Sequence, residues 1–184
     1  MLTMNEYIIA TPRLGLRHWN DADLAPFIEM NSDPAVMEYF PKLLTAAEAA
    51  AMVERIRRHF GEHHFGLFAV EEKSTQSFIG FTGLAIPRFE SFFTPCVEIG
   101  WRLKRSCWNQ GFATEAARAC LQYGFETIQL QRIVSFTSVQ NYRSENIMKK
   151  LGMQYLQDFD HPAIEKSNPL CRHLLYEINR SKSS

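Results

Sequence analysis

Cysteine is scarce in this sequence, and its scarcity excludes two common ways of holding a small protein together. The four cysteines among 184 residues are scattered, with neither the paired spacing of a metal site nor the pattern of a disulfide framework. This usage favours a reduced, cytoplasmic setting. Apolar runs long enough to span a membrane or to form a signal peptide are also missing. We therefore expect a soluble protein that does not interact with membranes.

An excess of charge of either sign is absent too. The 20 lysines and arginines balance the 20 aspartates and glutamates, so the formal net charge is zero. A neutral chain is not expected to bind nucleic acid through a broad electrostatic surface. Its length suits one domain, which we place at residues 1–184, with a core at about 11–178 and a frayed tail at 179–184.

Standard nucleotide-binding and metal-binding motifs are missing as well. The sequence has no GxxxxGK[ST] pattern and no GxGxxG pattern after a strand. His59, Glu62 and His63 do match the H-x-x-E-H pattern of a zinc site, which requires one continuous helix. Gly61 is expected to end the helix inside this motif, and the sequence supplies no clear third ligand. We therefore predict no metal.

What the sequence does contain is an interleaved series of strand and helix patterns. Segments rich in aromatic and β-branched residues predict strands at 13–19, 65–72, 77–86, 96–103, 132–139, 155–160 and 172–179. Apolar residues at helical spacing predict helices within 20–33, 45–60, 112–127 and 143–151. Thr45 and Glu48 form a capping box at the start of the second helix, and Asn20 or Asp21 caps the first. The series predicts a mixed α/β domain with a meander in its middle.

The stretch WNQGFATEA, at 108–116, joins a predicted strand and loop to a helix. The first turn of a helix leaves N–H groups unpaired at an electropositive end, which attracts phosphate. Gly111 lets a ligand approach the backbone, Ala113 leaves the way clear, and Thr114 adds a hydroxyl. Arg102, Lys104 and Arg105 could pair with further phosphate oxygens. The alternative interpretation is an ordinary turn and cap.

Two longer stretches carry a family resemblance. Residues 97–125, VEIGWRLKRSCWNQGFATEAARACLQYGF, followed by RIVSFTSVQNYRSENIMKKLGM, resemble the acetyl-CoA-binding half of GNAT N-acetyltransferases. With TPRLGLR near the start, the resemblance extends over 11–178 and is closest to the branch that acetylates ribosomal-protein N-termini. It implies an α/β (α+β) fold with a mostly antiparallel sheet of about six or seven strands and about four helices.

The resemblance also implies where acetyl-CoA binds. The family pattern Q/R-x-x-G-x-G/A is matched at Gly111 and Ala113, but Trp108 stands at its first position. The coenzyme diphosphate would lie on the backbone of Trp108, Asn109, Gln110, Gly111, Phe112, Ala113 and Thr114. The pantetheine would pair with the main chain of Trp101, Arg102 and Leu103. Asn141 and Ser144 match further coenzyme contacts, although Asn141 equally suits a helix cap.

Glu98 is the predicted catalytic residue. Acetyl transfer by direct attack in a ternary complex requires a neutral amine, and a general base supplies it by removing a proton. Strand alternation places Glu98 on the face of Gly100 and Arg102, where apolar neighbours could raise its pKa. The alternative is a structural glutamate paired with Arg102 or Arg132. A protonating residue is left unassigned, because Met148 stands where many relatives carry tyrosine and Tyr142 is expected to point elsewhere.

The sequence does not identify the amine that accepts the acetyl group. A protein or peptide N-terminus leads, and the alternatives are a small amine such as a polyamine, amino acid or aminoglycoside. A non-catalytic CoA-binding module and a general phosphate-binding protein are further possibilities, and both a monomer and a homodimer fit the sequence.

Overall fold

The computed structural model describes residues 6–181, which form one eight-stranded sheet in the order β1-β2-β3-β4-β5-β6-β8-β7. Every neighbouring pair is antiparallel except β5 and β6. The strands are β1 (Ile9–Ala10), β2 (Leu14–Arg17), β3 (Leu67–Glu72), β4 (Ser77–Ala85), β5 (Glu98–Leu103), β6 (Arg132–Ser138), β7 (Gln154–Asp160) and β8 (Arg172–Asn179). The strand that sequence patterns missed is β1, whose two residues are too few to show alternation. Of the expected frayed tail, residues 182–184 lie outside the described part.

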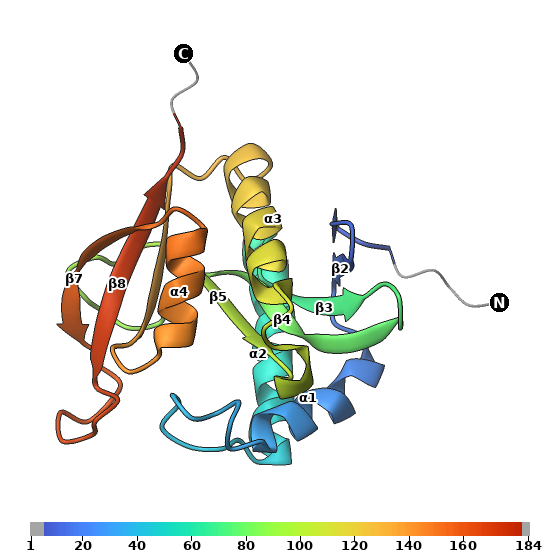
Figure 1. The fold of residues 1–184 in the computed structure, drawn as a ribbon, viewed down its shortest axis with the longest axis horizontal. Coiled ribbons are helices and arrows are strands. Elements are labelled where there is room, and N and C mark those ends of the chain that lie inside the picture. Colours follow the sequence, from blue (N-terminus) through green and yellow to red (C-terminus); the bar gives the residue numbers. More distant parts are fainter. Residues whose placement is uncertain (1–5, 182–184) are drawn as a thin grey trace.

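Four α-helices flank the sheet (Figure 1): α1 (Leu24–Ser32), α2 (Ala46–His63), α3 (Phe112–Glu126) and α4 (Tyr142–Lys150). The predicted caps are confirmed, since the Asn20 side chain accepts from the Asp23 N–H and Thr45 forms its capping box with Glu48. The predicted end of α2 at Gly61 is wrong. The helix continues to His63, and His64 ends it with a φ of +62°. An internal glycine costs a helix only about 1 kcal/mol, which neighbouring contacts can offset.

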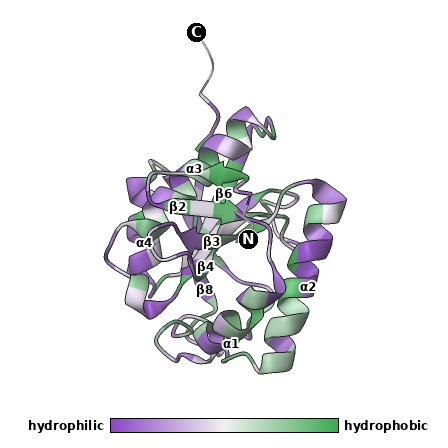
Figure 2. Cartoon of the chain, turned by 90° about the vertical axis from the view of Figure 1, so that its right-hand side faces the viewer, coloured by the Kyte–Doolittle hydropathy of each residue, from purple (hydrophilic) through white to green (hydrophobic). Residues whose placement is uncertain are grey.

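The two faces of the sheet carry separate hydrophobic cores. Phe68 and Val70 of β3 pack with α3 on one face, whereas Ala69 between them packs with α1 and α2 on the other. Figure 1 shows α2 running behind β4 and β5, with α3 in front. Figure 2 shows that α2 carries both hydrophilic and hydrophobic residues along its length, and its buried positions are Ala49, Val53 and Ile56. The sheet is thus enclosed between two helical layers.

A third cluster forms where the β4–β5 connection folds back over the sheet. Phe93, Val134, Phe159 and Leu175 are buried there, with Phe89 packed against them. Phe92 in the same connection is 63% exposed. The connection therefore covers β6, β7 and β8 on the face opposite α3. Within 6–181, no helix has the length and apolar character needed to cross a membrane.

The sheet opens between β5 and β6. These parallel strands share one residue pair, Glu98 opposite Val134, where the Val134 N–H donates to the Val97 carbonyl at 2.9 Å. The Ser135 hydroxyl then donates to the Ile99 carbonyl at 3.0 Å, and the pairing goes no further. The edge of β5 beyond Ile99 is consequently left without a strand partner on that side.

Candidate active site

The loop before α3 presents a row of backbone donors. The first intrahelical bond runs from the Glu115 N–H to the Gly111 carbonyl at 3.0 Å, and Gly111 has a left-handed φ of +81°. Within the described part of the chain, the N–H groups of residues 111–114 have no hydrogen-bond acceptor. Four free donors at the positive end of a 15-residue helix form a favourable anion site. The helix start therefore offers free donors, and phosphate binding there stays a prediction.

Arg13 holds this loop in position. Its Nη1 donates to the Gln110 carbonyl at 2.9 Å, its Nε donates to Glu115 Oε2 at 2.6 Å, and its guanidinium lies 4.5 Å from the Phe112 ring centroid. Thr11 adds a hydroxyl bond to Glu115 Oε1 at 2.6 Å. Although burial alone would raise the pKa of Glu115, these bonds from Thr11 and Arg13 lower it. Sequence reasoning missed this role, because nothing in TPR at 11–13 indicates contact with a helix a hundred residues away.

Trp108 connects the loop to β5. Its indole Nε1 donates to the Leu103 carbonyl at 2.9 Å, and Arg143 lies 4.8 Å over its ring. The indole thus satisfies one of the β5 carbonyls expected to face pantetheine. The main-chain groups of Trp101 remain available for pantetheine, because they face β6 where the two strands have separated. The open edge of β5 therefore centres on Trp101, and Trp108 links its end at Leu103 to the loop that leads into α3.

Glu98 lies at the point where the strands separate. Part of its surface is exposed, but protein atoms surround the carboxyl, and this burial raises its pKa to about 7. The two arginines considered as partners are engaged elsewhere: Arg132 pairs with Glu177 at 2.9 Å, and Arg102 donates to Asn31. Among residues 6–181, no ion pair or side-chain hydrogen bond reaches the Glu98 carboxyl. A carboxyl that is partly ionised near neutral pH can accept a proton from an amine.

Two basic residues near the loop do not extend it. Strand alternation directs Arg102 toward α1, where it contacts Asn31 and Phe40, and Lys104 lies 5.9 Å over the Phe78 ring. Both side chains therefore pack on the face opposite α3. Their expected contact with phosphate oxygens at the loop is not supported.

Asn141 caps α4. Its Oδ1 accepts from the Ser144 N–H at 3.1 Å, and its Nδ2 donates to Thr137 Oγ1 at 3.0 Å and to Ser144 Oγ at 3.1 Å. The capping interpretation is confirmed, and the coenzyme contact remains a prediction. Tyr142 is 68% exposed and Met148 is buried in the core, so the usual position of a protonating tyrosine supplies no acid.

The histidines of the zinc-like motif have structural contacts instead. His59 and His63 do lie on one continuous helix, contrary to the expected break at Gly61. The Ile86 N–H donates to His59 Nε2 at 3.2 Å, which leaves Nδ1 as the donor to the Phe65 carbonyl at 2.8 Å. Across 6–181, no three His, Cys, Asp or Glu side chains gather as a metal site. His59 thus links α2 to the segments just before β3 and just after β4.

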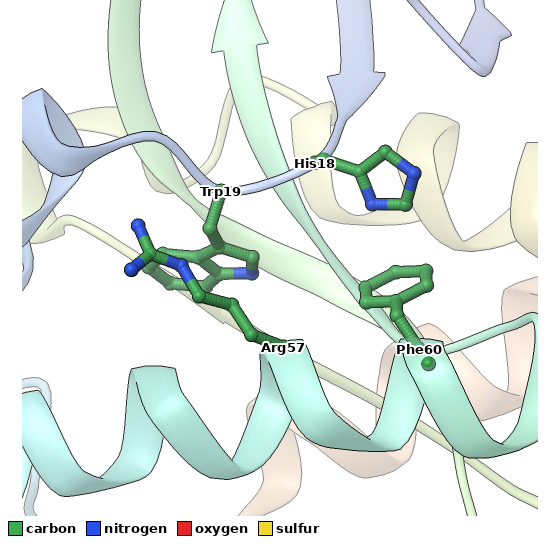
Figure 3. A pocket seen from close by; sticks show the side chains of 5 residues that line it. His18, Trp19, Arg57 and Phe60 are labelled. Carbon is green, nitrogen blue, oxygen red and sulfur yellow. The ribbon is translucent and has the colours of Figure 1, made fainter.

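A shallow hollow of about 360 Å³ lies beside α2 (Figure 3), lined by His18, Trp19, Arg57, Phe60 and Gly61. Arg57 there pairs with Asp21 and Glu54, and the Trp19 indole donates to the Leu67 carbonyl at 2.7 Å. The hollow includes none of the predicted site residues, and its charged group is already neutralised.

The arrangement defines an α/β protein that presents free amides to an anion beside an open strand edge. Comparison with known proteins gives the class: residues 13–154 match the model of the acetyltransferase (GNAT) domain, and the chain belongs to this family. The expected family and fold class are thereby confirmed.

Relatives of known sequence and structure agree. The chain is 32% identical over 171 residues to the uncharacterized N-acetyltransferase YnaD of Bacillus subtilis, an alignment that covers 92% of this chain and 95% of that protein. A GNAT-family acetyltransferase from Bacillus anthracis superimposes with a TM-score of 0.77 at 27% identity, covering 93% of this chain and 97% of that one. The chain is an N-acetyltransferase of a family that uses acetyl-CoA.

Proposed function

We propose that this protein transfers the acetyl group of acetyl-CoA to a primary amine, with Glu98 as general base. One observation carries the proposal: the free amides of residues 111–114 adjoin an open strand edge that begins at an unpaired, partly ionised Glu98. The proposed phosphate site at residues 111–114, the β5 edge for an extended ligand and the proton acceptor Glu98 thus form one continuous candidate site.

The chain's own groups have separate tasks in this proposal. The loop amides bind the diphosphate, and Asn141 and Ser144 lie at the start of α4 to contact the coenzyme. In this proposal, the Trp101 N–H stabilises negative charge on the thioester carbonyl oxygen. Glu98 accepts the proton of the ammonium, so that the neutral nitrogen attacks the carbonyl carbon and the C–S bond breaks. The thiolate leaves without a strong acid, since a thiol has a pKa of about 8.5, and it takes up the second proton that the nitrogen releases as the amide forms.

A protein or peptide N-terminus is the acceptor we favour. Solved neighbours include a ribosomal-protein-S5-alanine acetyltransferase from Vibrio fischeri at 14% identity and TM-score 0.74, and a spermidine N-acetyltransferase from Vibrio cholerae, in complex with CoA and spermine, at 17% and 0.72. Each superposition covers 92% of this chain, and it covers 94% of the alanine acetyltransferase and 96% of the spermidine acetyltransferase. At these identities the likeness shows a shared fold only. The charge of Arg102, on the same strand face as Glu98, argues against a polycation.

The setting we infer is the cytoplasm, where thiols stay reduced. All four cysteines are free in the structure, and Cys120 lies fully buried against the sheet. Burial and the Glu98 carboxylate raise the pKa of Cys96 to about 11, so this thiol is not a nucleophile. Direct transfer therefore remains simpler than a covalent acetyl-enzyme.

A thiol-release assay with acetyl-CoA tests the proposal on a panel of peptides, polyamines and aminoglycosides. We expect release with peptides above the rate of hydrolysis without an acceptor. Calorimetry with CoA and ADP is the companion measurement, since equal affinity for both would indicate a general phosphate-binding protein. Tight CoA binding with no thiol release for any amine would indicate a non-catalytic module instead.

A further inference from the structure

Arg102 is surrounded by protein, and no carboxylate within residues 6–181 pairs with it. Its guanidinium carbon lies 3.9 Å from the Phe40 ring centroid and 5.4 Å from that of Phe81, and Nη1 donates to Asn31 Oδ1. Its Nε is buried and has no acceptor in the described part of the chain. Burial lowers the pKa of Arg102 to about 10, which still leaves the group charged at neutral pH. A buried charge without a counter-ion is costly, so its presence requires a reason.

Arg17 shows how this chain treats a structural arginine. Arg17 is 5% exposed and is held by two carboxylates, Asp23 at 2.7 Å and Glu71 at 2.9 Å. The fold itself thus supplies the carboxylates that neutralise this buried guanidinium. Arg102 receives a neutral amide and two aromatic faces instead. The contrast indicates that residues 6–181 supply no counter-ion for Arg102.

The Arg102 side chain is also held in a fixed position. Asn31 is fully buried, and its Nδ2 donates to the Phe27 carbonyl at 2.6 Å, which turns Oδ1 toward the guanidinium. The Phe40 ring lies against the guanidinium and is itself 37% exposed. Arg102 as a whole keeps part of its surface exposed. A guanidinium held in one position near the surface is suited to bind a carboxylate through a charge-assisted hydrogen bond.

Arg102 and Glu98 flank an open position on β5. They lie on one face of β5 with Gly100 between them, and a Cβ added to Gly100 would meet no atom within 4 Å. We propose that the amine acceptor lies across Gly100, with its nitrogen at Glu98 and a carboxylate of its own at Arg102. This inference rests on the proposed function and names its substrate class. Arg102 acts in it as a specificity residue.

The spacing restricts the acceptor further. Residues four apart on a strand are about 13 Å apart at their Cα atoms. An extended peptide advances about 3.5 Å per residue. The Glu98 and Arg102 side chains shorten the distance between their charged groups when they reach toward each other. A peptide whose carboxylate lies two or three residues after its amine can then span that distance. The substrate class is therefore a peptide N-terminus with a nearby carboxylate, and a polyamine lacks the required charge.

Matched acceptors that differ by one charge test the inference. We would compare trialanine with trialanine amide, measuring kcat/KM by thiol release. Wild type should prefer the acid by about 10-fold or more, the effect of one net charge-assisted hydrogen bond. Arg102→Gln should bring the ratio close to one, whereas Arg55→Gln, at an exposed arginine of α2, should keep the wild-type ratio. An unchanged ratio in Arg102→Gln, or no preference in wild type, would overturn the inference.

A binding measurement separates this inference from the proposed function. Calorimetry would measure the binding of N-acetyl-trialanine, and separately of its amide, to the wild-type protein loaded with CoA. This measurement depends neither on catalysis nor on a variant that must fold. Selective binding of the acid with no acetyl transfer to any amine would contradict the proposed function and support the Arg102 site. Acetyl transfer to peptides with equal binding of acid and amide would contradict the Arg102 site alone. Loss of binary acetyl-CoA affinity in a folded Arg102→Gln variant would assign the residue to the coenzyme and also overturn it.

Discussion

Arg13 Nε and Glu115 Oε2 lie 2.6 Å apart although the residues are 102 positions apart in sequence. The contact joins the turn between β1 and β2 to the first turn of α3. Since Arg13 also binds the Gln110 carbonyl, the first strands of the protein fix the loop proposed to hold the coenzyme.

Glu115→Gln should weaken CoA binding by about 3-fold to 10-fold. The pair is partly exposed, so its direct contribution to stability is about 1 kcal/mol or less, and the larger effect falls on loop geometry. Calorimetry gives the affinity. Arg57→Gln removes surface ion pairs of α2 and serves as the control, with no expected change in affinity. Wild-type CoA affinity in Glu115→Gln would show that the loop does not depend on this contact.

Gly111→Ala and Gly152→Ala form a matched pair. Both glycines are left-handed, with φ of +81° and +80°, so each alanine should cost about 1–2 kcal/mol in unfolding free energy. Only Gly111 belongs to the proposed phosphate seat, and we expect CoA affinity to fall about 10-fold there and to stay unchanged in Gly152→Ala. Equal affinities in the two variants would remove residues 111–114 from coenzyme binding.

Glu98→Gln should lower kcat by about 100-fold to 10,000-fold with little change in acetyl-CoA affinity, because a general base contributes that much. Since burial raises the pKa of Glu98 to about 7, the wild-type kcat/KM should rise with pH up to about that value and then level off. The rise attributed to Glu98 should be missing in the variant. A variant with the wild-type rate at all pH values would exclude Glu98 as the base.

The same pKa shift predicts a pH-dependent stability. The folded Glu98 carboxyl keeps its proton up to about pH 7, whereas the unfolded one loses it near its usual value of 4.5. Wild type should therefore lose about 1–3 kcal/mol of unfolding free energy relative to Glu98→Gln between pH 4.5 and 7, with no further loss above. Urea unfolding of both proteins at pH 5 and pH 8.5 measures the difference. A difference independent of pH would mean that the carboxyl is not perturbed.

Asn141→Asp separates capping from coenzyme contact. Aspartate keeps the oxygen that accepts from the Ser144 N–H but loses the amide donors and adds a negative charge. Stability should stay within about 0.5 kcal/mol of wild type, while CoA affinity should fall. Thr45→Ala is the counterpart, since it removes a cap from α2 at about 1 kcal/mol and should leave CoA binding intact. If both variants bind CoA like wild type, Asn141 is a cap alone.

Much of the fold follows from local patterns in the sequence. The strands from 65 to 103 were predicted as a meander, and they pair antiparallel in that order. The capping signals at Asn20 and Thr45 marked real helix starts. Gly61 was misread because local propensity is weak compared with the contacts of His59, which reach to Phe65 and Ile86.

The local geometry of the candidate site was predictable from the sequence, but the contacts around it were not. Strand period and helix-start geometry located Glu98 and Gly111, because both depend on neighbours in sequence. The contacts of Arg13 with Gln110 and of Arg102 with Asn31 join distant segments, and no local pattern specifies them. The sequence likewise did not show that Arg132 pairs with Glu177 and therefore does not pair with Glu98.

The single residue pair between β5 and β6 has a consequence for the lifetime of the protein. A molecule with amides of its own that inserts at this opening completes the secondary structure, so its binding free energy adds to that of folding. At a hundredfold excess over the dissociation constant, this linkage amounts to about 2.7 kcal/mol. If the coenzyme binds at this opening as proposed, depletion of coenzyme would raise the unfolded fraction of this protein by the same free-energy difference.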